Sequence, residues 1–330
     1  MTPAIDINPP AGLDEFLAKH GWGDSAVALV AADASFRRYF RASTRDGRNA
    51  VLMDAPPPHE DPKPFIDIAR YLVGHGFRAP EIMAADLERG LVLIEDFGDT
   101  QVRQHLDVVP DDAEQIYRTA IDALVKLAST PAAELPQYDE AAYLREVQLF
   151  SEWYIPAMGL VVDNAQYDAL WRRALAPVAQ EQRVTVLRDY HAENIMLLPD
   201  GGQGIIDFQD ALIGHPAYDL VSLLQDARRD VDPALEQAML QYYRKATGVN
   251  ADFALHYALL GAQRNTKIIG IFTRLWKRDG KQRYLSFLPR MWGLLERDLA
   301  HPGLAELKDW FDRNVPPGVR AQSPDKPVSE

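Results

Sequence analysis

Residue patterns typical of strands and of helices occupy different parts of this chain, and that segregation limits the fold more than any other feature. Before residue 100 the sequence consists mostly of short β-favouring runs with one or two amphipathic helices. After that point it is mainly helical, apart from one brief β-rich island at residues 184–206. Strands first and helices later predict an α+β protein.

Short runs of β-favouring residues in the first part of the chain predict a small β-rich lobe. These runs are residues 27–31, 38–43, 49–53 and 91–94. Asp46-Gly47 lies between two of them and is a typical hairpin turn. Apolar residues recur at helical spacing from Phe65 to Val73, so one amphipathic helix is expected beside the strands.

The change of pattern predicts two lobes and a tail. We expect residues 1–95 to form the N-terminal lobe and residues 96–314 to form a larger helical lobe. Residues 315–330 are rich in Pro, Ser and charge, so we expect a mobile tail there.

Composition excludes several classes of protein and of partner. The formal net charge of −13 argues against nucleic-acid binding and against anionic membranes, because both are held by surplus Lys and Arg. No apolar run approaches the roughly 18 residues of a membrane span, and the N-terminus lacks the features of a signal peptide. The absence of cysteine excludes disulfides and thiolate metal sites. A cytoplasmic protein is the simplest expectation, and nothing in the sequence indicates an oligomeric state.

The β-rich island carries the residues with the clearest chemistry. Asp189 and Asn194 share a loop between apolar strands, and Asp207 directly follows the apolar run 204–206. Pro199-Asp200-Gly201-Gly202 is a strong turn, so the strands around it can bring these side chains together. A single loop Asp is more often a turn former, but two carboxylates and an amide at strand ends suit Mg²⁺.

The residue sequences of these motifs resemble those of a known family. Asp189-x4-Asn194 matches the catalytic loop of protein kinases, and Asp207-Phe208 matches the start of their metal-binding segment. The stretches 187–194, 205–210 and 214–220 resemble the aminoglycoside phosphotransferase-like kinases more closely than protein kinases. The resemblance extends from about Ser35 to Trp310. It implies a two-lobed protein-kinase-like fold and a phosphotransferase that uses ATP and Mg²⁺.

Further stretches are similar to one branch of that family. They are residues 35–41, 52–56, 95–99 and 150–154. The branch consists of kinases that phosphorylate the anomeric hydroxyl of N-acetylmuramate or N-acetylglucosamine in bacterial cell-wall recycling. The resemblance therefore implies a nucleotide and a small sugar as the partners of this chain.

The resemblance also implies roles for individual residues. Asp189 would orient the attacking hydroxyl, and Asn194 and Asp207 would hold Mg²⁺ against the phosphates. His191 would brace the catalytic loop, or it is simply a packed structural residue. Asp219 is expected to accept hydrogen bonds from backbone amides of the same loop.

The nucleotide site departs from the kinase pattern in several ways. Met53 stands where a protein kinase keeps its phosphate-binding Lys, Leu187 replaces the usual His, and residues 31–36 contain no glycine. Other groups must therefore contact the phosphates, and the candidates are Ser35, Arg37, Arg38 and Arg41. The arginines equally fit a solvated strand face. Glu95 and Phe97 would link the lobes and read the adenine edge, unless that segment is only a turn.

The acceptor sugar would be bound by the helical lobe. The candidate residues are Glu152, Trp153, Tyr154, Asp226, Arg228, Arg264, Asn265 and Lys267. The last three interrupt an apolar helix near Gly261 and Gly270, which suits a wall that a ligand approaches, although a solvated face has the same pattern. A carboxylate-bearing sugar such as N-acetylmuramate would favour a cation from this group.

Two alternatives stay open at this point. The chain could be another small-molecule kinase of the same family, acting on an aminoglycoside, a choline-like alcohol or an amino-acid hydroxyl. It could also be a catalytically silent kinase-like binding protein, which the absent phosphate-binding Lys would favour. A protein kinase is disfavoured, because no activation segment ending in Ala-Pro-Glu follows Asp207.

Overall fold

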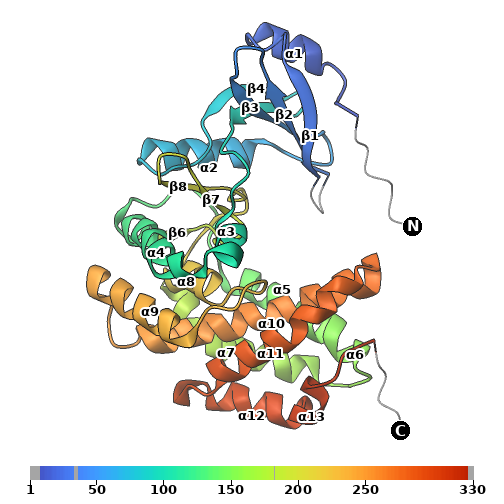
Figure 1. Ribbon diagram of the computed structural model, residues 1–330. Coiled ribbons are helices and arrows are strands. Elements are labelled where there is room, and N and C mark those ends of the chain that lie inside the picture. Colours follow the sequence, from blue (N-terminus) through green and yellow to red (C-terminus); the bar gives the residue numbers. More distant parts are fainter. Residues whose placement is uncertain (1–7, 33–35, 182, 326–330) are drawn as a thin grey trace. The chain divides into compact units, whose positions relative to one another are not determined.

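The computed structural model describes residues 8–32, 36–181 and 183–325 and divides the chain into two compact units (Figure 1). Unit 1 contains the described residues of 1–111 and 193–211, and unit 2 contains those of 112–192 and 212–330. Unit 1 is β-rich and unit 2 is mostly helical, so the expected α+β class is confirmed. Among the described residues, no helix is long and apolar enough to cross a membrane.

Unit 1 is built on a five-stranded antiparallel sheet with the order β1-β2-β3-β5-β4. Its strands are β1 (Ala26–Ala32), β2 (Arg38–Ser43), β3 (Asn49–Asp54), β4 (Ile82–Asp86) and β5 (Leu91–Glu95). The hairpin predicted at Asp46-Gly47 joins β2 to β3, with Gly47 at φ 88°. The sequence analysis did not identify β4, an apolar run ending in Asp86 of which only Ala84 is buried.

In the part of unit 1 that the structure describes, three α-helices accompany this sheet. They are α1 (Leu13–Lys19), α2 (Lys63–Gly74) and α3 (Val102–Val108). Leu13, Phe16 and Leu17 of α1 pack against alternate strand residues, including Phe40 and Leu52, and form one apolar core. Because side chains alternate between the two faces of a strand, α1 covers one face of the sheet.

A second hairpin belongs to unit 1, although it lies far along the chain. Its strands are β7 (Ile195–Leu197) and β8 (Gln203–Ile205). Backbone hydrogen bonds join it to the first part of the chain, from Leu197 to Thr100 and from Ile205 to Arg78. The expected lobe boundary after residue 95 needs correction for this reason: residues 96–111 and 193–211 pair with unit 1.

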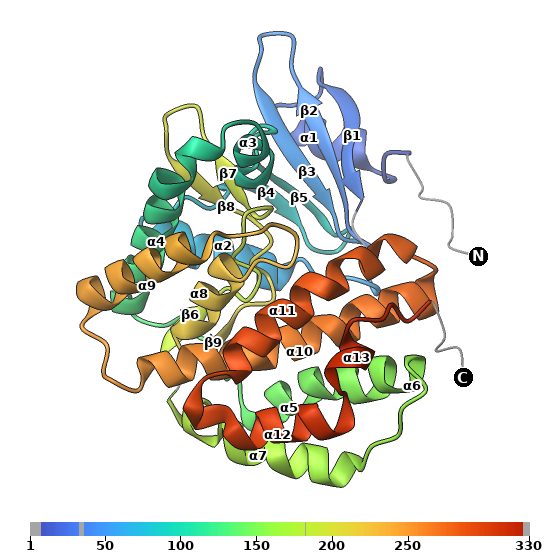
Figure 2. The same cartoon turned by 60° about the horizontal axis from the view of Figure 1, so that its bottom comes forward.

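Unit 2 is a helical assembly around one long helix. Its longer helices are α4 (Ala113–Ser129), α5 (Glu140–Leu149), α7 (Asn164–Gln180), α8 (Ala217–Leu224), α9 (Pro233–Thr247), α10 (Phe253–Asp279), α11 (Leu288–Leu299) and α12 (Ala305–Asn314). The shorter pieces are η2 (Phe150–Tyr154), α6 (Ile155–Ala157), η3 (Gln282–Phe287), η4 (Pro302–Leu304) and α13 (Pro317–Arg320). Figure 2 shows α11 running along α10. Strands β6 (Val184–Val186) and β9 (Leu212–Gly214) form a short antiparallel ladder in this unit.

The expected mobile tail from residue 315 is wrong for the part that the structure describes. Residues 317–320 form α13, and the side chain of Arg320 is buried. It donates hydrogen bonds to Asp312 (2.7 Å) and Glu296 (3.0 Å) and lies over the ring of Trp292. One arginine with two carboxylate partners thus anchors a segment whose composition alone predicts disorder. Residues 326–330 lie outside the described residues.

Candidate active site

The candidate catalytic loop starts in unit 2 where β6 ends, and Asp219 holds its backbone. The carboxylate of Asp219, in the first turn of α8, accepts hydrogen bonds from the amides of Leu187 (2.7 Å) and Arg188 (2.8 Å). The predicted capping role of Asp219 is confirmed. Burial raises the pKa of Asp219 to about 7, although the two amide donors act in the opposite direction.

Arg188 adopts an unusual backbone conformation just before Asp189, the candidate catalytic carboxylate. Its φ of 70° lies in the left-handed region, which residues with a side chain rarely occupy. Such conformations persist only where the surroundings enforce them. Here Asp219 holds the amide, and Glu146 of α5 holds the guanidinium at 2.5 Å. The loop is therefore fixed from both its main chain and its side chain.

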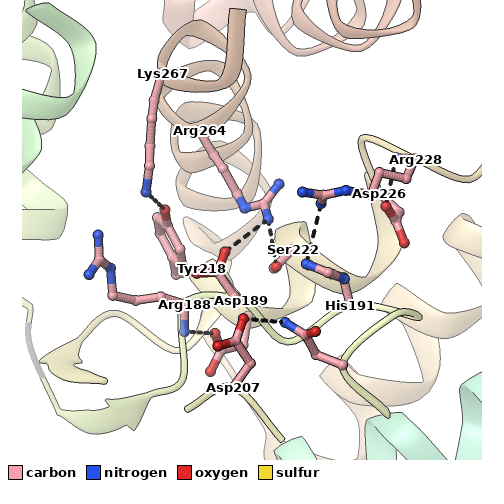
Figure 3. A network of polar contacts seen from close by, with 12 residues as sticks. Arg188, Asp189, His191, Asp207, Tyr218, Ser222, Asp226, Arg228, Arg264 and Lys267 are labelled. Carbon is pink, nitrogen blue, oxygen red and sulfur yellow. Dashed lines mark hydrogen bonds and ion pairs between the residues drawn. The ribbon is translucent and has the colours of Figure 1, made fainter. Parts of the chain in front are cut away.

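Asp189 lies among cations from α10 and from its own loop (Figure 3). Arg264 of α10 approaches its carboxylate to 3.9 Å, and the same Nη2 donates to Ser222 at 2.8 Å. Burial raises the pKa of Asp189, but the charges of Lys267 and Arg264, followed by His191 and Arg188, outweigh it and leave the pKa below its usual range. The Asp189 side chain is 46% exposed, so its carboxylate is accessible.

Lys267 and Arg188 share one counter-ion, Glu146. Lys267 lies 2.8 Å from that carboxylate and 3.3 Å from the hydroxyl of Tyr218. Burial raises the pKa of Glu146, but the two cations and the hydroxyl of Tyr138 hold it at about 2. The sequence analysis did not identify Glu146. Glu146 directly precedes Val147, a buried residue of the amphipathic α5. An acidic residue so close to the buried face of a helix was the signal that could have identified it.

Asp226 and Arg228 lie beside the end of the loop in unit 2. Asp226 is buried and accepts hydrogen bonds from the amides of Ala192 (3.3 Å) and Arg228 (2.8 Å). The guanidinium of Arg228 approaches Nε2 of His191 to 3.5 Å. Burial lowers the pKa of His191 below its usual value. Asp226 thus supports the loop backbone, and Arg228 adds another cation near its side chains.

Asn194 and Asp207 come together in unit 1 through the β7–β8 hairpin. The Asn194 amide donates to the Asp207 carboxylate at 3.1 Å, and the main-chain amide of Ile206 donates to the Asn194 carbonyl. Asp207 has φ 61°, which is also in the left-handed region that residues with a side chain rarely occupy. A carboxylate and an amide oxygen are hard donors that suit Mg²⁺, which takes its remaining ligands from phosphate and water. The donor set fits this ion.

Phe97 packs against the same hairpin. Its ring forms a small core with Met196 and Leu198, and a Cβ on Gly204 would lie 2.5 Å from it. Glu95 pairs with Arg78 at 3.0 Å. The segment after β5 therefore supports the hairpin that carries Asn194 and Asp207, a contact that sequence reasoning did not anticipate.

The arginines predicted to contact phosphate are paired with carboxylates in unit 1. Arg38 lies 2.5 Å from the buried Asp54, and Arg41 lies 2.6 Å from Asp96 and 2.8 Å from Asp99. Arg37 approaches Glu60 to 3.7 Å. The pairs with Asp96 and Asp99 raise the pKa of Arg41 further above its usual value. Ser35 lies outside the described residues, and Met53 is fully buried.

Two of the residues predicted to bind the acceptor are structural. Tyr154 is buried among Phe150 and Trp292, and its hydroxyl accepts a hydrogen bond from the Trp292 indole (3.2 Å). Asn265 is buried and donates to Gln225 and Asp298 on the far side of α10 from Lys267. Both predictions are corrected by these internal contacts. Glu152 is exposed and Trp153 partly buried on η2.

The glycines of α10 also serve internal packing rather than a ligand. A Cβ on Gly261 would lie 2.5 Å from the Asp298 carboxylate, and one on Gly270 would lie 2.4 Å from the main chain of Leu149. Their spacing therefore reflects the close approach of α11 and of the end of α5. Of the α10 candidates, only Arg264 and Lys267 interact with Asp189.

Comparisons of sequence point to a phosphotransferase. The profile of the phosphotransferase enzyme family matches residues 26–255. A protein of Pseudomonas aeruginosa named N-acetylmuramate/N-acetylglucosamine kinase is 41% identical, over 94% of this chain and 95% of its own length. A protein of Caulobacter vibrioides with the same name is 36% identical, over 92% of this chain and 96% of its own length.

Comparisons of structure identify the fold. An aminoglycoside phosphotransferase in complex with gentamicin aligns with a TM-score of 0.62 at 14% identity, covering 91% of this chain and 99% of that one. A choline kinase from Streptococcus pneumoniae aligns with a TM-score of 0.56 at 14% identity, covering 89% and 98%. The expected kinase-like fold is confirmed.

Proposed function

Because the chain belongs to the phosphotransferase enzyme family, we propose that it transfers the γ-phosphate of ATP to the anomeric hydroxyl of N-acetylmuramate and N-acetylglucosamine. The names of its relatives support this assignment, since the matches cover nearly the whole of both chains. The observation that carries it is the environment of Asp189, a carboxylate on a loop fixed by Asp219 and surrounded by cations.

Asp189 would orient the acceptor hydroxyl and take its proton late. A carboxylate whose pKa is lowered is a weak base, so it is poorly suited to deprotonate an ordinary alcohol before attack. An anomeric hydroxyl is more acidic than an ordinary alcohol, because the ring oxygen withdraws electrons from the same carbon. Phosphoryl transfer through a loose transition state demands positioning more than basicity. A weak base such as Asp189 is therefore sufficient for an anomeric hydroxyl, which loses its proton more easily than an ordinary alcohol.

Unit 1 would bind the nucleotide and the metal. Asn194 and Asp207 would hold Mg²⁺, which when bound supplies positive charge to the β- and γ-phosphate oxygens. Backbone groups near Glu95 and Phe97 would contact adenine. Ser35, Arg37, Arg38 and Arg41 stay the candidate phosphate contacts, and a phosphate would compete there with the carboxylates that pair with the three arginines.

The charge around Asp189 favours a neutral or anionic acceptor over a cationic one. Arg188, Arg264 and Lys267 all contribute positive potential there. An aminoglycoside or a choline-like alcohol would meet repulsion at this position. An amino sugar with an acetylated nitrogen carries no positive charge. A cytoplasmic location follows from this proposal, because the reaction requires ATP.

Release of ADP from purified protein tests the proposal. With ATP and Mg²⁺, we expect turnover with N-acetylglucosamine and with N-acetylmuramate, and none above background with choline or gentamicin. Turnover with a cationic acceptor alone would overturn the substrate assignment. If no acceptor gives turnover while ATP still binds, the protein is a silent kinase-like binder instead.

A further inference from the structure

The trio of Lys267, Arg188 and Glu146 carries more positive than negative charge. Glu146 is the carboxylate that both cations contact, at 2.8 Å from Lys267 and 2.5 Å from Arg188. One carboxylate cannot neutralise two cations, so the trio keeps a net positive charge. A buried surplus charge is costly unless a nearby anion balances it.

The neighbouring charges reduce this surplus but do not remove it. Asp189 lies close enough to Lys267, Arg264 and Arg188 for all three to lower its pKa. Those three cations thus face two ionised carboxylates, Asp189 and Glu146. Asp226 interacts with the separate group around His191 and Arg228, and Asp219 is occupied by the loop amides. Among the described residues, the ion pairs of this group thus leave positive charge in surplus next to Asp189.

Both cations of α10 have hydrogen-bonding capacity to spare. The ammonium of Lys267 has three donors, and its hydrogen-bond partners among the described residues are Glu146 and Tyr218. Nη1 of Arg264 is buried and has no hydrogen-bond partner in the part of the chain that the structure describes. Arg264 and Lys267 are three residues apart and project from one face of the helix, as Figure 3 shows.

We propose that Lys267, assisted by Arg264, forms an anion subsite beside Asp189 that binds a carboxylate carried by the acceptor sugar. The inference rests on the proposed function. It adds a structural reason why the protein would prefer one of the two proposed substrates over the other. N-acetylmuramate is N-acetylglucosamine with a lactic acid ether, so the two differ by the group that this subsite recognises. The carboxylate balances the surplus charge, whereas the neutral sugar leaves it unbalanced.

The proposal predicts a difference between two substrates in one protein. The quantity to measure is the ratio of kcat/KM for N-acetylmuramate to kcat/KM for N-acetylglucosamine. Lys267→Met removes the charge but keeps the apolar stem, and Arg188 still pairs with Glu146. We expect this variant to lower the ratio at least about tenfold. Lys267→Arg keeps the charge and should keep most of the preference.

A matched control lies on the same helix. Lys277 is exposed and lies over the ring of Trp276, roughly 15 Å along the helix axis from Lys267. Lys277→Met should leave the ratio unchanged. Equal loss of kcat/KM for both sugars in Lys267→Met would overturn the subsite while leaving the proposed function intact. Wild-type protein that phosphorylates neither sugar would overturn both.

Salt provides a test that does not depend on a variant folding. In wild-type protein, raising the NaCl concentration should lower kcat/KM for N-acetylmuramate more than for N-acetylglucosamine, because screening weakens the contact with the carboxylate. A ratio of the two values that does not change with salt would contradict an anion subsite.

Discussion

Two clusters of basic residues, one in each unit of this protein, differ in how their charge is balanced. In unit 1, Arg38 is paired with the buried Asp54, and Arg41 has two acidic partners, Asp96 and Asp99. In unit 2, a single carboxylate, Glu146, serves both Lys267 and Arg188. Carboxylates match or outnumber the cations in the first arrangement, and cations outnumber carboxylates in the second.

This difference separates a structural use of charge from a chemical one. While no ligand is bound, a cation whose charge is matched by its own carboxylates stabilises the fold and adds little to the local potential. A cation that shares its counter-ion keeps part of its charge for another group, here Asp189. Although the protein as a whole is acidic, the catalytic loop therefore lies in a locally positive environment. Four variants test whether the two uses of charge are distinct.

The largest effect is expected at Asp189 itself. Asp189→Asn keeps the shape of the side chain but removes the negative charge that orients the hydroxyl. We expect kcat to fall on the order of 10³-fold, with binding of ATP and Mg²⁺ unchanged, because the residues proposed to bind them lie in unit 1. Steady-state kinetics and calorimetric titration measure the two quantities. A variant with near wild-type kcat would show that Asp189 is not catalytic.

Arg38→Ala removes the ion pair between Arg38 and the buried Asp54 in unit 1. It leaves Asp54, which is 1% exposed, without its cation. The free energy of unfolding should fall by about 3–5 kcal/mol, measured by urea denaturation. Arg48→Ala is the control, because Arg48 pairs with Asp46 on the surface and lies over the ring of Trp22, so its loss should destabilise the protein much less. Equal small losses in both variants would contradict a structural role for Arg38.

Asp219→Ala removes the support of the catalytic loop in unit 2. The amides of Leu187 and Arg188 lose their acceptor, and the left-handed conformation of Arg188 loses one of its constraints. We expect kcat to fall about 10²-fold, because a displacement near 1 Å can cost that much. Asp219→Asn keeps one acceptor oxygen, so its kcat should lie between those of Asp219→Ala and the wild type. Unchanged kcat in both would show that the loop holds its shape without Asp219.

The smallest effect is a shift of the pH profile in Lys267→Met. Asp189 must be ionised to act, and its lowered pKa places the loss of kcat at a pH below the usual range for aspartate. The groups that lower it are Lys267, Arg264, His191 and Arg188. Removing the Lys267 charge raises the pKa of Asp189, so kcat should decline at a higher pH on the acid side. An acid limb that does not move would mean that Lys267 does not influence Asp189.

The sequence predicted what depends on neighbouring residues. The hairpin between β2 and β3, the amphipathic α2 and the motif of Asp189, Asn194 and Asp207 are all encoded within short windows. The hydrogen bonds of Asp219 to the loop were also predictable, because the motif fixes its spacing from Asp189. Whether Asp189, Asn194 and Asp207 act as assigned stays a prediction.

Long-range contacts explain what the sequence did not predict. Glu146 contacts Lys267 from a helix far away in the sequence, and Arg320 converts a polar tail into a packed segment. The positive φ of Arg188 and Asp207 has no signal in residue type, because neither is glycine. Asn265 and Tyr154 were misassigned because a polar or aromatic residue on a helix has the same pattern whether its partner is a ligand or a neighbouring helix.

The position of the transferred phosphate tests the central claim most directly. Purified protein would be given ATP, Mg²⁺ and N-acetylglucosamine labelled with ¹³C at the anomeric carbon, and the product followed by ³¹P and ¹³C NMR. The account predicts a single sugar phosphate whose phosphorus couples to the labelled carbon. Phosphate on any other hydroxyl, or ATP consumption without a sugar phosphate, would contradict it.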